Sequence, residues 1–388
     1  MNRPSNIAVI GAGLGGLTAA LALQRQGFRV RVFEQARVLG EVGAGISLSA
    51  GIGRALADLG IGDALLAAST PCPDVAFVHY RTGALLAGQV EQAPVDRGFE
   101  TARHIHRADL HAILLDAVRA NDASAVATDK PLTSVSQDAD RAIAGFADGT
   151  TEGADLLIAA DGARSAVRAL LFDNTPPEFS GQVAFRCLVP AAAAAPFMRG
   201  AAVSIGKGRI FHRYALRGGT VVNVVGIAQT PQWAAEGWNT PATNAEFGAL
   251  YVDFHPDVTG LIAAAPPESL IKWGLFVRPR FTGWSQGRVT LLGDAAHPIL
   301  PFLGLGAALA IEDGVVLARA LVAHDDLATA LHAYEAARID RVDAVRDKTI
   351  RQGEIIQATD PDNDDLASSP SQEAPLFDYD PVAVSVDA

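Results

Sequence analysis

Cysteine is scarce in this chain of 388 residues, where Cys72 and Cys187 are the only two. Two thiols cannot form a disulfide framework or a thiolate metal cage, and the 9 histidines include no H-E-x-x-H pair, so no metal site is expected. A basic excess is also missing, because 31 Lys and Arg stand against 43 Asp and Glu and the net charge is −12. Nucleic acids and anionic membrane surfaces attract basic proteins, so neither is an expected partner.

Long apolar runs are missing as well. The start, M-N-R-P-S-N-I-A-V-I-G, lacks the pattern of a signal peptide, and the cytoplasm is the expected location. The stretch from Ala295 to Ile311 has no Lys, Arg, Asp or Glu, but it is too short and too broken by proline and glycine to span a bilayer. With 49% apolar residues at this length, we expect two lobes or two joined domains with ample buried core.

The N-terminal segment is typical of a strand, a glycine turn and a helix, followed by a second parallel strand. Asn6–Ile10 is apolar, leucines follow at helical spacing up to Gly27, and residues 28–33 are rich in Val and Phe. Glycine-rich G-A-G-L-G-G separates the first strand from the helix. A dinucleotide-binding unit has this order of elements.

Three glycines and one carboxylate in this unit have the spacing that a dinucleotide requires. Gly11 permits the tight turn, Gly13 lets a pyrophosphate approach the backbone, and Gly16 lets helix and strand pack closely. Glu34 lies 18 residues after Gly16, at the end of the second strand, where it can accept hydrogen bonds from ribose hydroxyls. A dinucleotide is therefore expected, but this motif alone does not separate NAD from FAD.

The remainder alternates between helical and strand patterns. Helices are predicted at about 54–66, 107–120, 243–254 and 306–324, and strands at 182–189, 201–205, 209–216, 220–228 and 270–277. The strands after residue 180 indicate an inserted antiparallel sheet, with a hairpin turn at Arg217-Gly218-Gly219. The tail from Gln357 to Gln372 is acidic and polar, and it is predicted to lie on the surface.

Two further strand-to-helix corners narrow the choice of cofactor. D-L-L-I-A-A-D-G-A-R-S-A-V-R covers 155–168, and 287–314 includes G-D-A-A-H-P and G-L-G-A-A. These segments resemble those of the class-A FAD monooxygenases of the 4-hydroxybenzoate hydroxylase fold, most of all salicylate hydroxylase and 3-hydroxybenzoate 6-hydroxylase. Further segments that carry the resemblance are V-G-A-G-I-S-L, Arg107, V-A-F-R-C-L-V-P, K-W-G-L-F and F-D-Y-D-P. The resemblance extends from Asn6 to about Val345.

The resemblance implies an α/β fold: a Rossmann-like FAD-binding domain with an inserted antiparallel β-sheet substrate domain. The expected FAD-binding domain is discontinuous, at 1–178 and 279–345, with the substrate domain at 179–278 and a C-terminal segment at 346–388. Parts of 70–105 are equally open to assignment to the substrate lobe.

The resemblance also assigns FAD-binding residues. Those expected along the cofactor are Gly11, Gly13, Gly16, Glu34, Gly45, Arg107, Asp161, Asp294, Gly306 and Ala307. Asp294 would accept hydrogen bonds from the ribityl hydroxyls, although a helix-capping role is the ordinary alternative. Asp313, about two turns into the following helix, is expected to matter far less for FAD than Asp294.

Four residues are expected at the catalytic face. His212 and Tyr214 share one face of a strand, and His212 would deprotonate a phenol; an ordinary strand histidine is as good an interpretation. Tyr214 is more often a packing residue. Ser47 would face the substrate or be a plain turn serine, and Pro298 would pack by the flavin ring.

Other positions leave the substrate open. Arg186 and Arg213 could bind a substrate carboxylate, but arginines on sheets are usually solvated or paired. The chain departs from the family where Leu305 and Ala308 replace Gln and Asn, and where Ser49-Ala50 replaces Pro-Asn. Ile210 stands where related hydroxybenzoate and hydroxynicotinate enzymes often have His.

The expected activity is hydroxylation of a phenolic aromatic or heteroaromatic acid, such as salicylate or 3-hydroxybenzoate, through a flavin 4a-hydroperoxide. FAD is the expected cofactor, NADH or NADPH and dioxygen the co-substrates, and a monomer or homodimer the expected assembly. Alternatives are a 6-hydroxynicotinate-type hydroxylase, a flavin-dependent reductase or dehydrogenase on the same fold, and a flavin-bearing binding protein without turnover.

Overall fold

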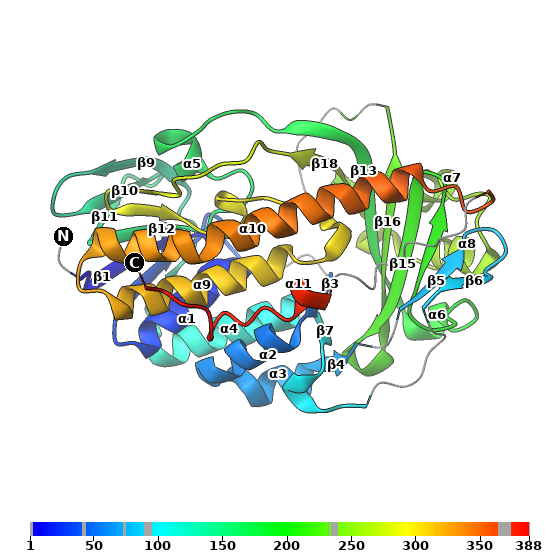
Figure 1. Ribbon diagram of the computed structural model, residues 1–388, viewed down its shortest axis with the longest axis horizontal. Helices are drawn as coiled ribbons and strands as arrows, with labels where there is room; N and C mark the ends of the chain where they lie inside the picture. The colour runs from blue at the N-terminus through cyan, green and yellow to red at the C-terminus, as the bar shows by residue number, and fades with distance from the viewer. Residues whose placement is uncertain are drawn as a thin grey trace.

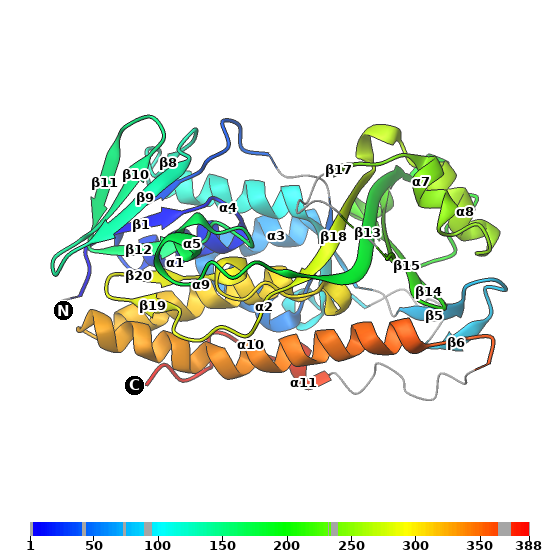
Figure 2. The same cartoon turned by 90° about the horizontal axis from the view of Figure 1, so that it is seen from above.

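The computed structural model describes residues 3–40, 44–72, 75–88, 95–231, 233, 240–363 and 374–387. Two lobes lie side by side, and one long helix runs along both of them (Figure 1). The same arrangement seen from above shows a sheet-rich lobe at one end and a helix-covered lobe at the other (Figure 2). This is the mixed α/β fold with an inserted antiparallel sheet that the sequence predicts.

The helix-covered lobe contains a mostly parallel sheet. Its strands are β1 (Asn6–Ile10), β2 (Arg29–Phe33), β8 (Val126–Ala127), β12 (Leu156–Ala159), β19 (Ser285–Gln286) and β20 (Val289–Leu291). They lie in the order β19-β20-β12-β1-β2-β8, and β1 pairs in parallel with β2 and with β12, which pairs in parallel with β20. The carboxyl ends of β1, β12 and β20 therefore meet at one edge, where ligands bind in such sheets.

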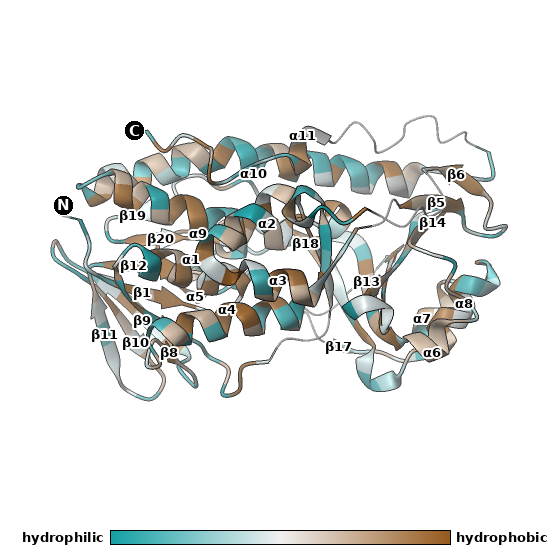
Figure 3. Ribbon diagram, turned by 90° about the horizontal axis from the view of Figure 1, so that it is seen from below, coloured by the Kyte–Doolittle hydropathy of each residue, from teal (hydrophilic) through white to brown (hydrophobic). Residues whose placement is uncertain are grey.

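Three predicted helices pack on this sheet close to their expected bounds. They are α1 (Leu14–Arg25), α4 (Arg107–Asn121) and α9 (Gly306–Ala323). Helix α1 contacts both α4 and α9, and its residues Leu14 to Leu23 are all buried. Apolar residues dominate α9, which is brown along most of its length (Figure 3). The first corner is therefore held in the centre of a core.

The helix expected at 54–66 is divided in the structure. It consists of α2 (Ala50–Leu56), a π-helical turn (Ala57–Ile61) and α3 (Gly62–Ala68). Gly60 has a φ of +81°, a left-handed conformation that a continuous α-helix does not contain. Ser49, which departs from the family pattern, accepts a hydrogen bond from the Ile52 amide at 3.4 Å and caps α2.

Two small sheets complete this lobe. One is formed by β3 (Gly45–Leu48), β4 (Ser69–Pro71) and β7 (Arg103–His106), in the order β3-β7-β4. The other, which the sequence analysis missed, is formed by β9 (Leu132–Gln137), β10 (Ala142–Phe146) and β11 (Thr151–Ala154). Its edge strand β9 is mostly solvent-exposed, so its apolar residues are few and the alternation is weak.

The second lobe is built on an eight-stranded sheet. Its strands are β5 (Ala76–His79), β6 (Leu85–Ala87), β13 (Glu178–Pro190), β14 (Ala202–Gly206), β15 (Arg209–Leu216), β16 (Val221–Gln229), β17 (Thr240–Pro241) and β18 (Ile271–Val277). The order is β17-β18-β13-β16-β15-β14-β5-β6. The predicted hairpin joins β15 to β16, and β5 and β6 come from the segment 70–105 that the sequence left open. They extend the sheet through the parallel β14–β5 pair.

The outer face of this sheet carries two short helices. The helix expected at 243–254 is only α7 (Asn244–Ala249), followed by α8 (Pro256–Ala263). Thr243 and Glu246 form a capping box that starts α7, and the buried Phe254 then packs on the sheet from a turn. Proline at the first position of α8 begins a separate helix instead of extending α7.

The long helix α10 (Leu327–Ala358) was not predicted. Its 32 residues are about half polar, and its buried face includes polar residues such as Arg338 and Thr349. The apolar stripe is therefore interrupted, and teal and brown alternate along the helix (Figure 3). Asp326 caps its first turn, accepting a hydrogen bond from the Thr329 amide at 3.0 Å. The boundary expected at 345/346 falls inside this helix, so residues 346–358 continue the preceding element.

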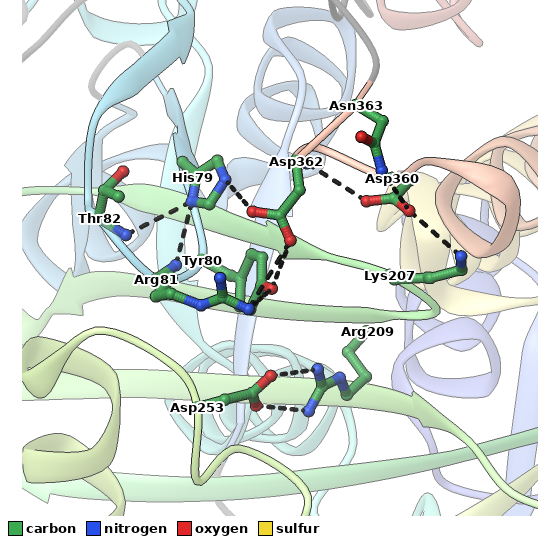
Figure 4. A network of polar contacts seen from close by, with 10 residues as sticks. All are labelled: His79, Tyr80, Arg81, Thr82, Lys207, Arg209, Asp253, Asp360, Asp362 and Asn363. Atoms are coloured by element: carbon green, nitrogen blue, oxygen red, sulfur yellow. Dashed lines mark hydrogen bonds and ion pairs between the residues drawn. The ribbon is translucent and has the colours of Figure 1, made fainter.

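The end of α10 reaches the sheet lobe through a polar cluster (Figure 4). Asp362 accepts a hydrogen bond from the Tyr80 hydroxyl at 2.8 Å and lies 3.1 Å from His79 Nε2. Lys207 pairs with Asp360 at 3.2 Å. Contacts from two parts of the sheet therefore hold the residues just after α10.

The C-terminal residues return to the first lobe. Arg319 donates a hydrogen bond to the Pro381 carbonyl at 2.7 Å, and Arg54 pairs with Asp380 at 3.2 Å. The polar excursion expected at 357–372 lies mostly outside the described residues. No helix among the described residues is long and apolar enough to cross a membrane.

Candidate active site

The first corner has the geometry that its glycines predict. Gly11 has a φ of +103°, and a Cβ there would collide with the Ala160 carbonyl oxygen. A Cβ at Gly16 would collide with the Gly11 carbonyl oxygen, whereas a Cβ at Gly13 would meet nothing within 4 Å. Two glycines therefore allow the close approach of β1, β12 and α1, and Gly13 leaves the outside of the turn open.

Glu34 is connected to this turn by hydrogen bonds. One carboxylate oxygen accepts a hydrogen bond from the Ala12 amide at 2.8 Å, and the other accepts one from the Ala36 amide at 2.9 Å. The side chain is thus held at the end of β2, beside the glycine loop. A carboxylate oxygen has more than one acceptor position, so capacity remains for ribose hydroxyls.

At the second corner, only one of the two carboxylate oxygens of Asp161 has a hydrogen-bond partner among the described residues. Asp161 Oδ2 accepts a hydrogen bond from the Ala166 amide at 2.8 Å, at the start of α5 (Ala166–Leu171). Its Oδ1 is buried without a hydrogen-bond partner among the described residues. Burial raises the pKa of this carboxyl group, because the charged form loses solvation.

The third corner places Asp294 in the interior between the two lobes. Burial raises the pKa of Asp294, while the nearby charges of His297 and Arg107 oppose the shift. Gly306 and Ala307 begin α9 just beyond, and a Cβ at Gly306 would meet only Ile299, at 3.8 Å. The helix N-terminus is therefore open to a ligand. Leu305 and Ala308 are buried, so the apolar side chains that replace Gln and Asn belong to the core.

Asp313 has a larger role than its position in the sequence suggests. Its side chain is fully buried and accepts a hydrogen bond from the Gly293 amide at 2.8 Å. It also lies 2.6 Å from His297 Nε2, and it accepts a hydrogen bond from Arg338 Nε at 2.7 Å. Its carboxylate therefore holds the backbone that carries Asp294, a structural role that the sequence did not indicate; the expectation that Asp294 matters more for FAD binding stays a prediction.

A partly open cavity lies between the third corner and β18. Asp294 and Pro298 line it from the corner, Trp273 lines it from β18, and Ala163 lines it from just after Asp161. The structure thus brings two of the three corners and Pro298 to one space. His212, Tyr214 and Ser47 are not among the residues that line it.

Those residues belong to a neighbouring cluster where the lobes meet. The rings of His212 and Tyr214 lie 4.8 Å apart by centroid, which agrees with their predicted common face of β15. The Tyr214 ring also contacts that of His104 in β7, at 4.1 Å by centroid, and a Cβ at Gly45 would collide with the Tyr214 ring. Gly45 is therefore placed against Tyr214, and its amide donates a hydrogen bond to Asn223 Oδ1 at 2.8 Å.

Ser47 faces the interior of the same cluster. It pairs with His104 across the β3–β7 ladder, and its hydroxyl lies within hydrogen-bond reach of the Cys72 thiol. Burial raises the pKa of Cys72 to about 12, so this thiol is not a nucleophile at neutral pH.

Both histidines of the cluster are neutral at physiological pH. Burial lowers the pKa of His104 to about 3 and that of His212 to about 4. Burial also raises the pKa of Tyr214, which keeps the phenol protonated. The cluster therefore presents hydrogen-bonding groups without charge.

Arg186 supplies a positive charge beside this cluster. Burial lowers its pKa to about 10, so the guanidinium remains protonated near neutral pH. It lies over the Trp273 ring at 4.9 Å and interacts electrostatically with Tyr214 and Arg107, but forms no ion pair with any described carboxylate. Arg213 points elsewhere, donating a hydrogen bond to Ser204 Oγ at 3.3 Å.

Sequence reasoning missed His104 and Asn223. Asn223 pairs with Tyr214 in the β15–β16 ladder and is fully buried. A polar residue at an inward position of a strand was the available signal for both. Ile210, by contrast, joins an apolar cluster with Trp273 and Leu300.

These features fit FAD. The open turn at Gly13, the unpartnered Asp161 Oδ1 and the free approach to Gly306 are what an extended dinucleotide requires at three separated points. Asp294, beside Arg107, provides a buried carboxylate between the last two points.

The chain belongs to the FAD binding domain family, whose model matches residues 5–349. It is an FAD-dependent monooxygenase. Among curated proteins, it is 37% identical over 361 residues to 3-amino-4-hydroxybenzoate 2-monooxygenase PtnB3 of Streptomyces platensis, covering 91% of this chain and 88% of that protein. It is 36% identical over 362 residues to 6-hydroxynicotinate 3-monooxygenase of Pseudomonas fluorescens, covering 89% of this chain and 90% of that protein.

Solved structures agree with the fold. Klebsiella pneumoniae HpxO complexed with FAD and uric acid is 29% identical, with a TM-score of 0.82 over 96% of this chain and 93% of that one. A salicylate hydroxylase substrate complex is 25% identical, with a TM-score of 0.81 over 98% and 97%. The resemblance to the class-A aromatic hydroxylases is thereby confirmed.

Proposed function

We propose that this enzyme hydroxylates a small aromatic or heteroaromatic acid that carries one carboxylate and a ring hydroxyl. The observation that carries the proposal is Arg186, a partly buried arginine whose Nε is buried without a hydrogen-bond partner and whose guanidinium forms no ion pair among the described residues. A buried charge is costly unless it is paired, so a carboxylate of the substrate is its natural partner. The relatives named above act on hydroxylated aromatic acids by their names, which supports this substrate class.

The site around Arg186 suits a flat ring. Trp273 lies against the guanidinium and lines the cavity, while His212 and Tyr214 lie on the same face of the sheet as Arg186. An aromatic acid bound to Arg186 would extend between these rings and the third corner. Pro298 and the apolar residues beside it would keep water away from the reacting ring carbon.

FAD would be held along the three corners. Gly11, Gly13, Gly16 and Glu34 would hold the adenosine and pyrophosphate half, with Arg107 along the phosphates and Gly45 nearby. Asp161 and Asp294 would accept hydrogen bonds from the ribityl region. Gly306 and Ala307 would present amides to the pyrimidine end of the flavin.

When bound, FAD supplies the redox chemistry that couples NAD(P)H and dioxygen to the substrate. The balanced reaction converts one NAD(P)H, one proton, one dioxygen and a ring C–H into NAD(P)⁺, water and a ring C–OH. Neutral His212 would take the phenol proton, which makes the ring carbon more nucleophilic, and Tyr214 would orient the ring hydroxyl. Ser47 would contribute a hydroxyl at the edge of this site.

A substrate panel tests the proposal. Purified holoenzyme is assayed with NADH and NADPH against salicylate, 3-hydroxybenzoate, 6-hydroxynicotinate and 3-amino-4-hydroxybenzoate, and against the corresponding amides. We expect product that incorporates ¹⁸O from ¹⁸O₂ with at least one acid and none with its amide. Equal turnover of acid and amide would rule out the carboxylate contact, and NAD(P)H oxidation without oxygen incorporation would favour the reductase alternative.

Arg186 variants make the test specific. Arg186→Met should raise KM for the acid by roughly 100-fold, the effect of removing one partner of a buried ion pair, and Arg186→Lys should restore part of it. Arg209→Met is the matched control, because Arg209 pairs with Asp253 at 2.8 Å in the polar cluster of Figure 4. An unchanged KM in Arg186→Met would contradict the assignment.

A further inference from the structure

We propose that His104 is a specificity-determining residue that contacts the substrate together with His212 and recognises an uncharged polar substituent on its ring. The inference rests on the proposed function, because it places the substrate ring beside Tyr214. His104 comes from the FAD-binding lobe, whereas His212 and Tyr214 come from the sheet. The site would therefore be complete only where the two lobes meet.

The position of His104 supports this role. It lies in β7, between Ser47 of β3 and Thr70 of β4 in the two ladders. Its ring contacts that of Tyr214 in a tilted arrangement, with an interplanar angle of 31°, and only 4% of the residue is exposed. The ring of His212 also contacts Tyr214, at 4.8 Å by centroid, so the two imidazoles meet the same phenol ring.

Unsatisfied polar atoms concentrate at this place. His104 Nδ1, His212 Nε2 and Asn223 Nδ2 are buried, and none has a hydrogen-bond partner among the described residues. Most buried polar atoms in folded proteins are hydrogen-bonded, so each exception needs an explanation. Three exceptions on three strands around one tyrosine point to a ligand with several hydrogen-bonding groups.

Charge then restricts the ligand. Burial holds both imidazoles neutral, since the pKa values of His104 and His212 lie at about 3 and about 4. A neutral imidazole offers one donor and one acceptor, which match a hydroxyl, an amino group or a ring nitrogen. A second carboxylate would lack a cation here, because Arg186 is the charge assigned to the first. The expected ligand is therefore a monoacid with a neutral polar ring substituent.

A packing role for His104 is the alternative, and the choice of variants separates the two. His104→Phe keeps a flat ring against Tyr214 and removes both nitrogens. His104→Gln keeps a donor and an acceptor and loses the ring. His332→Phe, at an exposed position of α10, is the control for the substitution itself.

The experiment measures dissociation constants of FAD-loaded enzyme by the change in flavin absorbance. The ligands are benzoate, 3-hydroxybenzoate, 3-aminobenzoate and isophthalate. We expect His104→Phe to weaken 3-hydroxybenzoate and 3-aminobenzoate by about tenfold while benzoate changes little, and His104→Gln to recover part of the difference. FAD content and the thermal unfolding midpoint should match those of the control.

Three outcomes would overturn the inference. If His104→Phe weakens benzoate and 3-hydroxybenzoate equally, or neither, the residue is a packing residue. Tighter binding of isophthalate than of 3-hydroxybenzoate by the unsubstituted enzyme would contradict a neutral polar site. If the unsubstituted enzyme binds no aromatic acid at all, both the proposed function and the inference fail. The first two outcomes overturn the inference alone, so the two failures can be told apart.

Discussion

His297 Nε2 lies 2.6 Å from Asp313 Oδ2, in the interior between the third corner and α9. The same oxygen accepts a hydrogen bond from the Gly293 amide, and the other oxygen accepts one from Arg338 of α10. Arg338 is itself fully buried and pairs with Glu312 at 2.7 Å. Buried ion pairs and hydrogen bonds thus connect the corner that would hold the flavin to helices α9 and α10.

Replacing Asp313 should damage stability first and FAD binding as a consequence. We expect Asp313→Asn to lower the free energy of unfolding by about 3–5 kcal/mol, because Arg338 and His297 lose a buried charged partner. Asp343→Asn, which breaks the half-exposed pair with Arg280, should cost about 1 kcal/mol or less. Urea unfolding of the apo-proteins measures both, and equal effects would contradict the network.

The effect of Asp313 should also depend on pH. Interaction with His297 and Arg338 outweighs burial and lowers the pKa of Asp313 to about 2, below its value in the unfolded chain. Its stabilisation is therefore complete above about pH 4 and is lost as the pH falls from there towards 2. The stability difference between the original chain and Asp313→Asn should be wide at pH 7 and shrink through that window.

Asp294 should behave in the opposite way. Burial raises its pKa, so ionising this carboxyl group at neutral pH works against folding. We expect Asp294→Asn to leave the apo-protein as stable or more stable, and to weaken FAD binding by at least tenfold. Thermal unfolding of the apo-protein and fluorescence titration with FAD separate the two effects. Parallel losses of stability and affinity would mean that Asp294 acts only as a structural residue.

Glu34 should distinguish FAD from FMN. The carboxylate is held beside the glycine loop, where the proposal places the adenosine ribose, so Glu34→Ala should weaken FAD binding and leave any FMN binding unchanged. Glu152→Ala, which removes a surface pair with Arg31, is the control. Cofactor released by heat from the unaltered protein should run as FAD in chromatography, and its running as FMN would refute the assignment.

His212 and Tyr214 should govern coupling between NAD(P)H and product. With its pKa lowered to about 4, His212 is unprotonated throughout pH 6–8 and can accept a hydrogen bond from a phenol. His212→Ala or Tyr214→Phe should retain FAD, lower the product formed per NAD(P)H and raise hydrogen peroxide. The His212→Ala defect should shrink at high pH, where the phenol ionises unaided. Unchanged coupling in both variants with the true substrate would make them packing residues.

Most elements near the cofactor follow local patterns in the sequence. The predicted strands 6–10 and 209–216 appear with the same bounds, because their apolar spacing and their flanking glycines act over a few residues. Helix α10 was not predicted because polar residues such as Arg338 interrupt its buried face, and it is stabilised by contacts such as Arg338 with Asp313 that no local pattern contains. The division of 54–66 depends on one left-handed glycine, Gly60.

The sequence by itself determined the three glycine-marked corners, and with them the FAD-binding fold, because each corner is a contiguous turn between a strand and a helix. Only the tertiary structure decided that Arg186 lacks a carboxylate partner among the described residues, that His104 meets Tyr214, and that Asp313 supports Asp294. His104 and Tyr214 lie more than a hundred residues apart in the chain and on different lobes. Such contacts arise when the two lobes pack against each other. The alternating pattern of one strand shows which of its side chains are buried, but it does not specify which residues of the other lobe they will contact.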